Sequence, residues 1–283
     1  MASQKPLSEQ TIMNGYVFYK IMRDPKKLKP LLEFILKTKI QKLTLIEPEK
    51  TLKERFSSKG VRLDLYVEDD EGAVYDVDVQ TTADGSLPLR MRYYQSMLDQ
   101  TFFPVGLNYS TLRKSFVIFI CDYDPFKQKR YIYTFQNRCD QDKNLLFGDR
   151  ASKIVVNTKG TKGRIRKELK EILAYLDHGE VTGKFSRELD EAVQALKESE
   201  EGALEYMTWM TYGAEQQAAG KFIRNVEQIR GWYDDKSDLP METMAKAIRV
   251  TIPQFENALT LIKTHPEMDD ADIASRINWW MYK

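Results

Sequence analysis

Apolar and polar residues alternate along two neighbouring stretches of the chain, Val61–Val67 and Ala73–Gln80. A period of two is typical of β-strands that bury one face. An acidic, glycine-containing turn separates the stretches, so the pattern predicts a β-hairpin. In the register that keeps the apolar faces together, Asp64 lies directly or diagonally opposite Asp78, with their Cβ atoms about 4.5–8 Å apart.

Helical periodicity and further apolar runs predict the other elements of the first 160 residues. Helices are predicted over Gly15–Arg23, Leu28–Lys37 (with Pro30 in its first turn) and Leu87–Phe103, and strands over Ile40–Ile46, Ser115–Cys121, Arg130–Phe135 and Lys153–Asn157. The almost wholly apolar run from Ser115 to Cys121 is typical of a central strand. The order of helices and strands predicts a mixed sheet with helices against its faces, an α/β or α+β fold.

From Arg164 onward the chain shows only helical periodicity. Helices are predicted over Arg164–Asp177, Ser186–Lys197 (with Ser186 as N-cap), Glu200–Trp232, Leu239–Arg249, Ile252–Thr264 and Asp270–Tyr282. Charge and secondary-structure type both change near residues 179–185, so we expect a first domain over residues 1–182 and a helical region over 183–283.

The helix pair over residues 239–264 has the order of a helix–turn–helix motif. Two features speak against DNA binding by this pair: Arg249 stands where a glycine would help the turn, and the surrounding tail is acidic. We therefore expect a packing role or homo-oligomerisation for this region, with DNA binding as the alternative.

Composition excludes several classes of protein. The chain has 283 residues, of which 42% are hydrophobic and 11% aromatic, as in a globular protein with an ample core. No apolar run is long enough to span a membrane and no signal peptide is evident, so we expect a cytoplasmic protein without a membrane partner. With only two histidines and two cysteines, a histidine-rich metal site and any catalysis by several imidazoles are excluded.

Charge is strongly segregated beneath a net charge of +1. Residues 1–60 and 81–186 each carry a net charge of +7, whereas residues 61–80 carry −6 and residues 187–283 carry −7. Basic segments around an acidic hairpin are typical of a polyanion-binding surface around a cation-binding centre, although an ordinary solvated surface gives similar counts.

The polar face of the hairpin concentrates carboxylates. Asp64, Asp76 and Asp78 share this face with Arg62 as the nearby cation. Carboxylates at this spacing repel one another unless a cation neutralises them, and a divalent ion does so well. Acidic residues on the outer face of a hairpin are also common as plain solvated surface, so the pattern alone leaves both interpretations open.

A series of short blocks resembles the recombination-promoting nuclease / transposase family of the PD-(D/E)XK nuclease superfamily. The blocks are GYVFYKIM with LLEFIL, KGVRLDLYVEDDEG, VYDVDVQ, RMRYYQSMLD, KSFVIFICDYDPF with RYIYTFQNRC, LLFGD and IVVNTKG. Their order and spacing agree over about residues 11–178. The resemblance implies a restriction-endonuclease-like mixed sheet flanked by helices, followed here by an all-helical C-terminal region.

The resemblance also implies roles for individual residues. As a Mg²⁺-dependent endodeoxyribonuclease, with Mn²⁺ as an alternative ion, the protein would chelate the metal with Asp64 and Asp78. Gln80 stands where the wider superfamily has a lysine, and Gln95 would face the same site from the helix that follows. Further candidates for contact with DNA are Arg62, Arg92, Tyr94, Lys59, Lys114 and Lys127.

Two departures from the family pattern bear on activity. The central motif is Asp-x-Gln rather than Glu-x-Gln, so the second carboxylate is one methylene shorter. Gly15, after Asn14, stands where similar sequences have an acid before an aromatic residue. The expected function is metal-dependent DNA cleavage in recombination or mobile-element biology; the alternative is a weakened member that binds nucleic acid or assembles with partners without cleaving.

Overall fold

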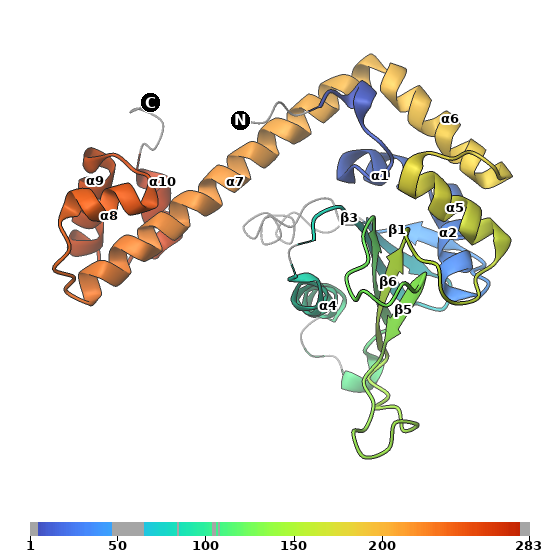
Figure 1. Ribbon diagram of the computed structural model, residues 1–283. Coiled ribbons are helices and arrows are strands. Elements are labelled where there is room, and N and C mark those ends of the chain that lie inside the picture. Colours follow the sequence, from blue (N-terminus) through green and yellow to red (C-terminus); the bar gives the residue numbers. More distant parts are fainter. Residues whose placement is uncertain (1–4, 47–64, 84, 104–105, 107, 278–283) are drawn as a thin grey trace. The chain divides into compact units, whose positions relative to one another are not determined.

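The computed structural model describes residues 5–46, 65–83, 85–103, 106 and 108–277 (Figure 1). Asp64, Arg62 and Lys59 lie outside these residues. The chain forms two compact units that change over between Met207 and Thr208, and each unit is described by itself below.

The first unit is built on a six-stranded mixed sheet with the order β1-β2-β3-β4-β6-β5. The strands are β1 (Leu43–Leu45), β2 (Leu65–Asp69), β3 (Val74–Gln80), β4 (Ser115–Cys121), β5 (Ile132–Phe135) and β6 (Ala151–Asn157). β3, β4 and β6 run parallel to one another, and the remaining pairs are antiparallel. All seven residues of β4 are buried, as its apolar sequence predicts for a central strand.

Helices cover both faces of this sheet (Figure 1). α4 (Leu87–Phe102) packs on one face, where Tyr94 meets the ring of Phe119 edge to face, with centroids 5.1 Å apart. α1 (Gly15–Met22), α2 (Pro25–Leu36) and α5 (Lys167–His178) lie on the opposite face. Short 3-10 turns occur at Leu7–Glu9 and Tyr109–Thr111.

The predicted fold class is confirmed, and so is the hairpin over its described part. Leu65 pairs with Val77 and Tyr66 with Asp76 in an antiparallel ladder. The turn closes with Gly72 at φ +79°, a left-handed conformation that glycine adopts without a steric penalty.

Two details of the predicted helices are wrong. α2 begins at Pro25, before Leu28, because the Asp24 side chain caps it by accepting from the Lys26 N–H at 2.9 Å. Pro30 therefore lies inside the helix and not in its first turn. In α6 (Lys184–Glu198), Gly183 is the N-cap and Ser186 is the third helical residue, whose hydroxyl accepts from the Gly183 N–H.

From Lys167 onward the described residues form helices and no strand, as the sequence predicts. After α5 and α6 come α7 (Glu200–Asp234), α8 (Met241–Ile248), α9 (Ile252–Thr264) and α10 (Asp270–Arg276). α6 packs against α1, and the Tyr16 hydroxyl donates to the carbonyl of Gly202 at 3.1 Å. Residues 183–207 thus pack with the first unit, while the limits 1–182 and 183–283 stay predictions for the nuclease-like and helical parts.

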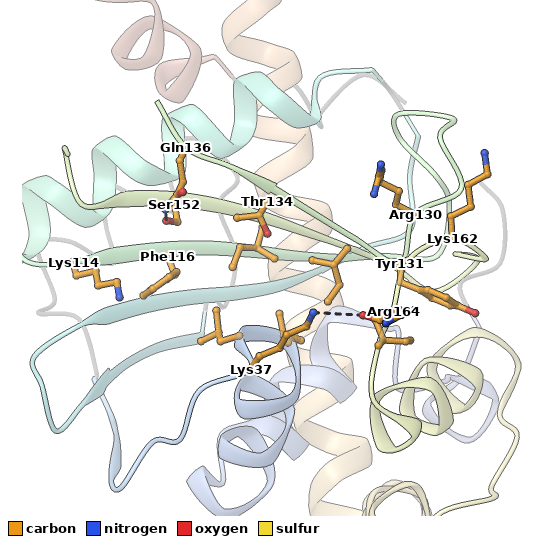
Figure 2. A pocket seen from close by; sticks show the side chains of 16 residues that line it. Lys37, Lys114, Phe116, Arg130, Tyr131, Thr134, Gln136, Ser152, Lys162 and Arg164 are labelled. Carbon is orange, nitrogen blue, oxygen red and sulfur yellow. Dashed lines mark hydrogen bonds between the residues drawn. The ribbon is translucent and has the colours of Figure 1, made fainter. Parts of the chain in front are cut away.

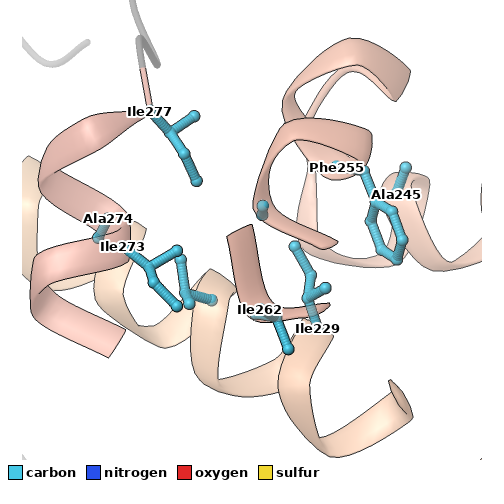
Figure 3. Packing of buried hydrophobic residues seen from close by; sticks show 9 residues of the cluster. Ile229, Ala245, Phe255, Ile262, Ile273, Ala274 and Ile277 are labelled. Carbon is cyan, nitrogen blue, oxygen red and sulfur yellow. The ribbon is translucent and has the colours of Figure 1, made fainter. Parts of the chain in front are cut away.

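The second unit has a hydrophobic core of its own (Figure 3). Its buried members come from the second half of α7, from α8, α9 and α10, and from the residue that follows α10: Val226, Ile229, Ala245, Phe255, Ala258, Ile262, Ile273, Ala274 and Ile277. The side chain of Thr251 caps α9 within a capping box with Gln254. None of the described helices in either unit combines the length and the hydropathy that a membrane crossing requires.

Candidate active site

The end of β3 presents a carboxylate and a carboxamide toward α4. Asp78 and Gln80 are two residues apart, so they share one face of the sheet, and Asp78 stands beside Phe119 of β4 in the parallel register. Phe119 contacts α4, which identifies the face. Asp78 is half-buried and Gln80 is buried, with 5% of its surface exposed.

Hydrogen bonds hold both side chains in place. One oxygen of Asp78 accepts from the backbone N–H of Val79 at 2.8 Å, and the other accepts from Nε2 of Gln80. Oε1 of Gln80 in turn accepts from the guanidinium of Arg90, in the first turn of α4. The three side chains form a chain of hydrogen bonds from carboxylate to amide to guanidinium. We call it the Asp78 centre.

Arg90 is the member of this centre that the sequence analysis missed. Its guanidinium lies 5.9 Å from the ring centroid of Tyr94 and 5.7 Å from that of Phe119, within cation–π range. Arg90 precedes Tyr94 by four residues, so both lie on one face of α4. That spacing is the signal in the sequence that could have identified Arg90, since Tyr94 was already a candidate site residue.

Burial dominates the electrostatics of the Asp78 centre. It raises the pKa of Asp78 from 3.8 to about 7, against the opposing effects of the Arg90 charge and of the hydrogen bonds from Val79 and Gln80. A carboxyl group with a pKa near neutrality binds a proton or a cation more readily than a solvated one, because either neutralises a charge that burial disfavours.

The other predicted site residues on α4 lie apart from these hydrogen bonds. Gln95 is buried and donates to the hydroxyl of Ser115 at 2.7 Å and to Asp99 at 3.2 Å. Ser115 pairs with Val74, four residues before Asp78, or about 13 Å along the strand. Gln95 therefore faces the opposite end of β3 from the Asp78 centre.

Tyr94 and Arg92 differ in their surroundings. Tyr94 is buried between α4 and the sheet, where its ring contacts Phe119 and Arg90. Arg92 is exposed and lines a cavity of about 490 Å³ toward β5 and β6, together with Lys153. The structure thus places Tyr94 next to Arg90, and Arg92 beside a separate concavity.

A family comparison decides the class of this protein. The model of the PD-(D/E)XK nuclease family transposases matches residues 13–175, which is more than half of the chain. The chain belongs to the PD-(D/E)XK nuclease family transposases. No curated protein and no solved structure matches it. The match covers the sheet, α1, α2 and α4, and it includes the whole Asp78 centre.

PD-(D/E)XK nucleases typically use a divalent metal ion. Within the described ranges no group of three or more His, Cys, Asp or Glu side chains is clustered for a metal. The donors that are present fit a hard cation in kind: a carboxylate of raised pKa and a carboxamide oxygen. Leu65, the residue after Asp64, pairs with Val77, the residue before Asp78.

Asn14 has a structural role in this PD-(D/E)XK chain. It is the N-cap of α1, and its side-chain oxygen accepts from the N–H groups of Tyr16 and Val17 at 3.0 and 3.3 Å. Its amide donates to Gln10 at 3.1 Å. Since these contacts use both ends of the carboxamide, Asn14 is committed to starting the helix.

Proposed function

We propose that this transposase-family protein is a metal-dependent DNA endonuclease that hydrolyses phosphodiester bonds at the Asp78 centre. The main support is the half-buried Asp78 carboxylate at the end of β3, which accepts a hydrogen bond from Gln80, whose amide oxygen accepts one from Arg90. All three residues lie inside the segment that matches the nuclease family. DNA is the partner that family membership implies.

In this proposal Asp78 and Asp64 hold Mg²⁺, with Mn²⁺ as an alternative. The strand register supports joint binding of one ion by these two aspartates. Leu65 stands opposite Val77, and each of these residues adjoins one of the two aspartates in the sequence. An ion held by these two carboxylates would supply polarisation of the scissile phosphate and a lowered pKa of a water molecule. Asp78 must be ionised to act as ligand, so proton and metal compete for the same oxygens.

Gln80 and Arg90 together replace the lysine found at this position elsewhere in the superfamily. An amide orients a water molecule through hydrogen bonds but carries no charge. Arg90 supplies that charge, and its bond to Oε1 fixes which end of the Gln80 amide faces Asp78. We therefore assign Gln80 to water positioning and Arg90 to charge compensation next to the phosphate.

The remaining predicted residues have peripheral roles in the proposal. Tyr94 sets the position of Arg90 through ring contact, and Gln95 anchors α4 to the start of β4 through Ser115. Arg92 is exposed on the α4 side of the sheet, as a contact to DNA requires. Arg62 is proposed as a further DNA contact because it precedes Asp64 by two residues in the sequence.

Nicking of supercoiled plasmid DNA tests the proposal. We expect cleavage in Mg²⁺ or Mn²⁺ that falls by about 10²-fold or more in Asp78→Ala and by about 10-fold or more in Arg90→Ala. Arg90→Lys should retain part of the activity because it keeps the charge. Asp140→Ala, which removes an exposed carboxylate from the hairpin after β5, is the matched control and should cleave normally.

Intact DNA under both metals, from a protein with native thermal unfolding, would contradict the proposal. Retained DNA binding in that case would favour the alternative of a family member that binds without cleaving. Equal cleavage by Asp78→Ala and by the parent protein would place the chemistry elsewhere.

A further inference from the structure

A groove with a cationic rim lies on the face of the sheet opposite to the Asp78 centre (Figure 2). It encloses about 450 Å³, within the usual range of about 300–1,000 Å³ for ligand sites. Phe116 and Ile154 form part of its apolar floor. We call it the basic groove after the five cations that line it: Lys37, Lys114, Arg130, Lys162 and Arg164.

The basic groove and the Asp78 centre lie on opposite faces of the sheet, because side chains along β4 alternate between the two faces. Phe116 lines the basic groove, whereas Phe119 stands beside Asp78 under α4. The two residues are three positions apart on one strand, so their side chains leave opposite faces of the sheet. One short segment of substrate therefore cannot occupy both the basic groove and the Asp78 centre.

Backbone hydrogen bonds bring the cations together from separate segments. The N–H of Tyr131 donates to the carbonyl of Lys162 at 3.1 Å, and the N–H of Lys162 donates to the carbonyl of Lys129 at 2.7 Å. Lys37, which ends α2 in a left-handed conformation, extends Nζ to the carbonyl of Arg164 at 3.5 Å. These bonds fix one end of the rim before any ligand binds.

Gly160 allows the close approach at this end of the groove. A Cβ atom on Gly160 would lie 2.5 Å from the Cα of Tyr131, closer than two carbon atoms can pack. The close approach supports the backbone bonds that place Arg130 and Lys162 side by side.

Within the described ranges, no carboxylate compensates the positive charge of the rim. No carboxylate is among the described residues that line the groove, and none of the five cations forms an ion pair with a described residue. Five like charges around one concavity repel one another, and a bound polyanion relieves that repulsion. The shape and charge of the groove therefore favour a ligand with several phosphates.

The spacing of the cations favours a strand over a single phosphate. Lys114 adjoins the sheet row in which Ser115 pairs with Ala151, whereas Arg130 and Lys162 lie near the row in which Ile132 pairs with Val156. These rows are five residues apart along β6, or about 16 Å. At the rise of about 3.4 Å per nucleotide in a helically stacked strand, that length corresponds to about five nucleotides.

Besides its cations, the groove offers groups that suit the neutral parts of a nucleotide. Ser152 and Thr134 present hydroxyls, and the half-buried ring of Tyr131 offers a surface on which a base can stack. Figure 2 shows Lys114 and Ser152 toward one end of the groove, and Arg130, Tyr131, Lys162 and Arg164 toward the other.

We propose that the basic groove binds a single nucleic-acid strand of about five nucleotides through its phosphates, separately from the segment at the Asp78 centre. The choice of a nucleic acid rests on the proposed function, whereas the groove and its charge do not. A second binding surface of this kind would hold a flanking or displaced strand while the Asp78 centre acts on another segment.

Salt-dependent binding of a fluorescein-labelled oligodeoxythymidylate of 12 nucleotides tests the proposal. The titration uses the full chain in EDTA, so no metal-dependent cleavage contributes. Arg130→Ala/Arg164→Ala removes two cations from the groove. Lys170→Ala/Arg187→Ala removes two exposed cations from α5 and α6 and is the matched control.

The slope of log affinity against log salt is negative. Loss of two phosphate contacts should make it shallower by about 1.4, at about 0.7 per contact. The control variant should keep the parent slope, and both variants should keep the parent melting temperature. dTMP and inorganic phosphate should displace the oligonucleotide only at concentrations at least about 100-fold higher than an unlabelled 12-nucleotide competitor.

An unchanged slope in the groove variant, or no binding by the parent protein at low salt, would overturn the proposal. Displacement by dTMP or phosphate at the concentration of the 12-nucleotide competitor would assign the groove to a small ligand. It would thus contradict the proposal that a nucleic-acid strand binds there. Failure of the Asp78 proposal appears separately, as loss of plasmid nicking with oligonucleotide binding intact.

Discussion

At the scale of single residues, the Asp78 centre makes folding stability depend on pH. Burial raises the folded pKa of Asp78 to about 7 from an ordinary value of 3.8. Between these values the folded state binds more protons than the unfolded state, so this residue stabilises the fold less as pH rises from 4 to 7. The ionised carboxylate is thus a cost that the site carries at neutral pH, as is common at functional sites.

Asp78→Asn should remove this dependence, because asparagine cannot ionise. The difference in unfolding free energy, variant minus parent, should rise by on the order of 2 kcal/mol from pH 5 to pH 8. Urea unfolding at both pH values, in EDTA, measures the difference. A difference that stays constant, or that falls with rising pH, would show that the Asp78 carboxylate is not disfavoured by burial.

Which site residues were predictable follows from how each is positioned. Asp78 and Gln80 lie on a strand whose alternation fixes their face from the sequence alone. Arg90 lies on a helix, where its contact with Gln80 depends on how α4 packs on the sheet. The contacts of Gln95 could not be predicted from the sequence for the same reason, since tertiary packing places it next to Ser115. The proposed roles of Asp64 and Arg62 concern residues outside the described ranges.

At the scale of elements, the predicted bounds match where the pattern is uninterrupted, in strands and helices alike. The bounds of β4 and α9 match the prediction because each has an uninterrupted pattern with clear ends. The predicted start of α2 is too late because apolar periodicity begins only at Leu28, whereas the Asp24 cap and Pro25 already start the helix. The basic groove had no sequence signature, since its five cations come from separate segments that only the fold brings together.

The turn between α8 and α9 provides a test of backbone strain. Arg249 ends α8 at φ +57°, in the left-handed region, and its side chain is exposed. Arg249→Gly should raise the unfolding free energy of the second unit by about 1 kcal/mol, because glycine has no Cβ penalty there. Arg249→Ala keeps the Cβ atom and is the control. Calorimetric melting that shows equal gains for both variants would rule out strain as the cause.

At the scale of the whole molecule, the packing of α6 and α7 predicts where the chain can be shortened. Tyr16 of α1 donates to Gly202 and Glu205 of α7, and its ring lies 5.3 Å from that of Tyr206. A chain ending at Met207 should therefore keep the melting temperature of the first unit within a few degrees.

A chain ending at residue 182 should melt at least about 10 °C lower, because α1 loses the buried contacts of α6 and α7. Circular dichroism melts of the two shortened chains compare them directly. Equal stability of both would mean that residues 183–207 contribute little to the first unit and that the predicted boundary at 182 is also a folding boundary.

Proposed cleavage at the Asp78 centre requires that Asp78 hold a divalent metal ion. Isothermal titration of Mn²⁺ at pH 7.5 measures this binding, with Asp78→Asn as the variant and Asp140→Asn as the control. We expect the parent protein and the control to bind alike, the Asp78 variant at least about 10-fold more weakly, and the parent affinity to fall below pH 7 as Asp78 takes up a proton. Binding of Mn²⁺ by Asp78→Asn with the parent affinity would contradict the claim.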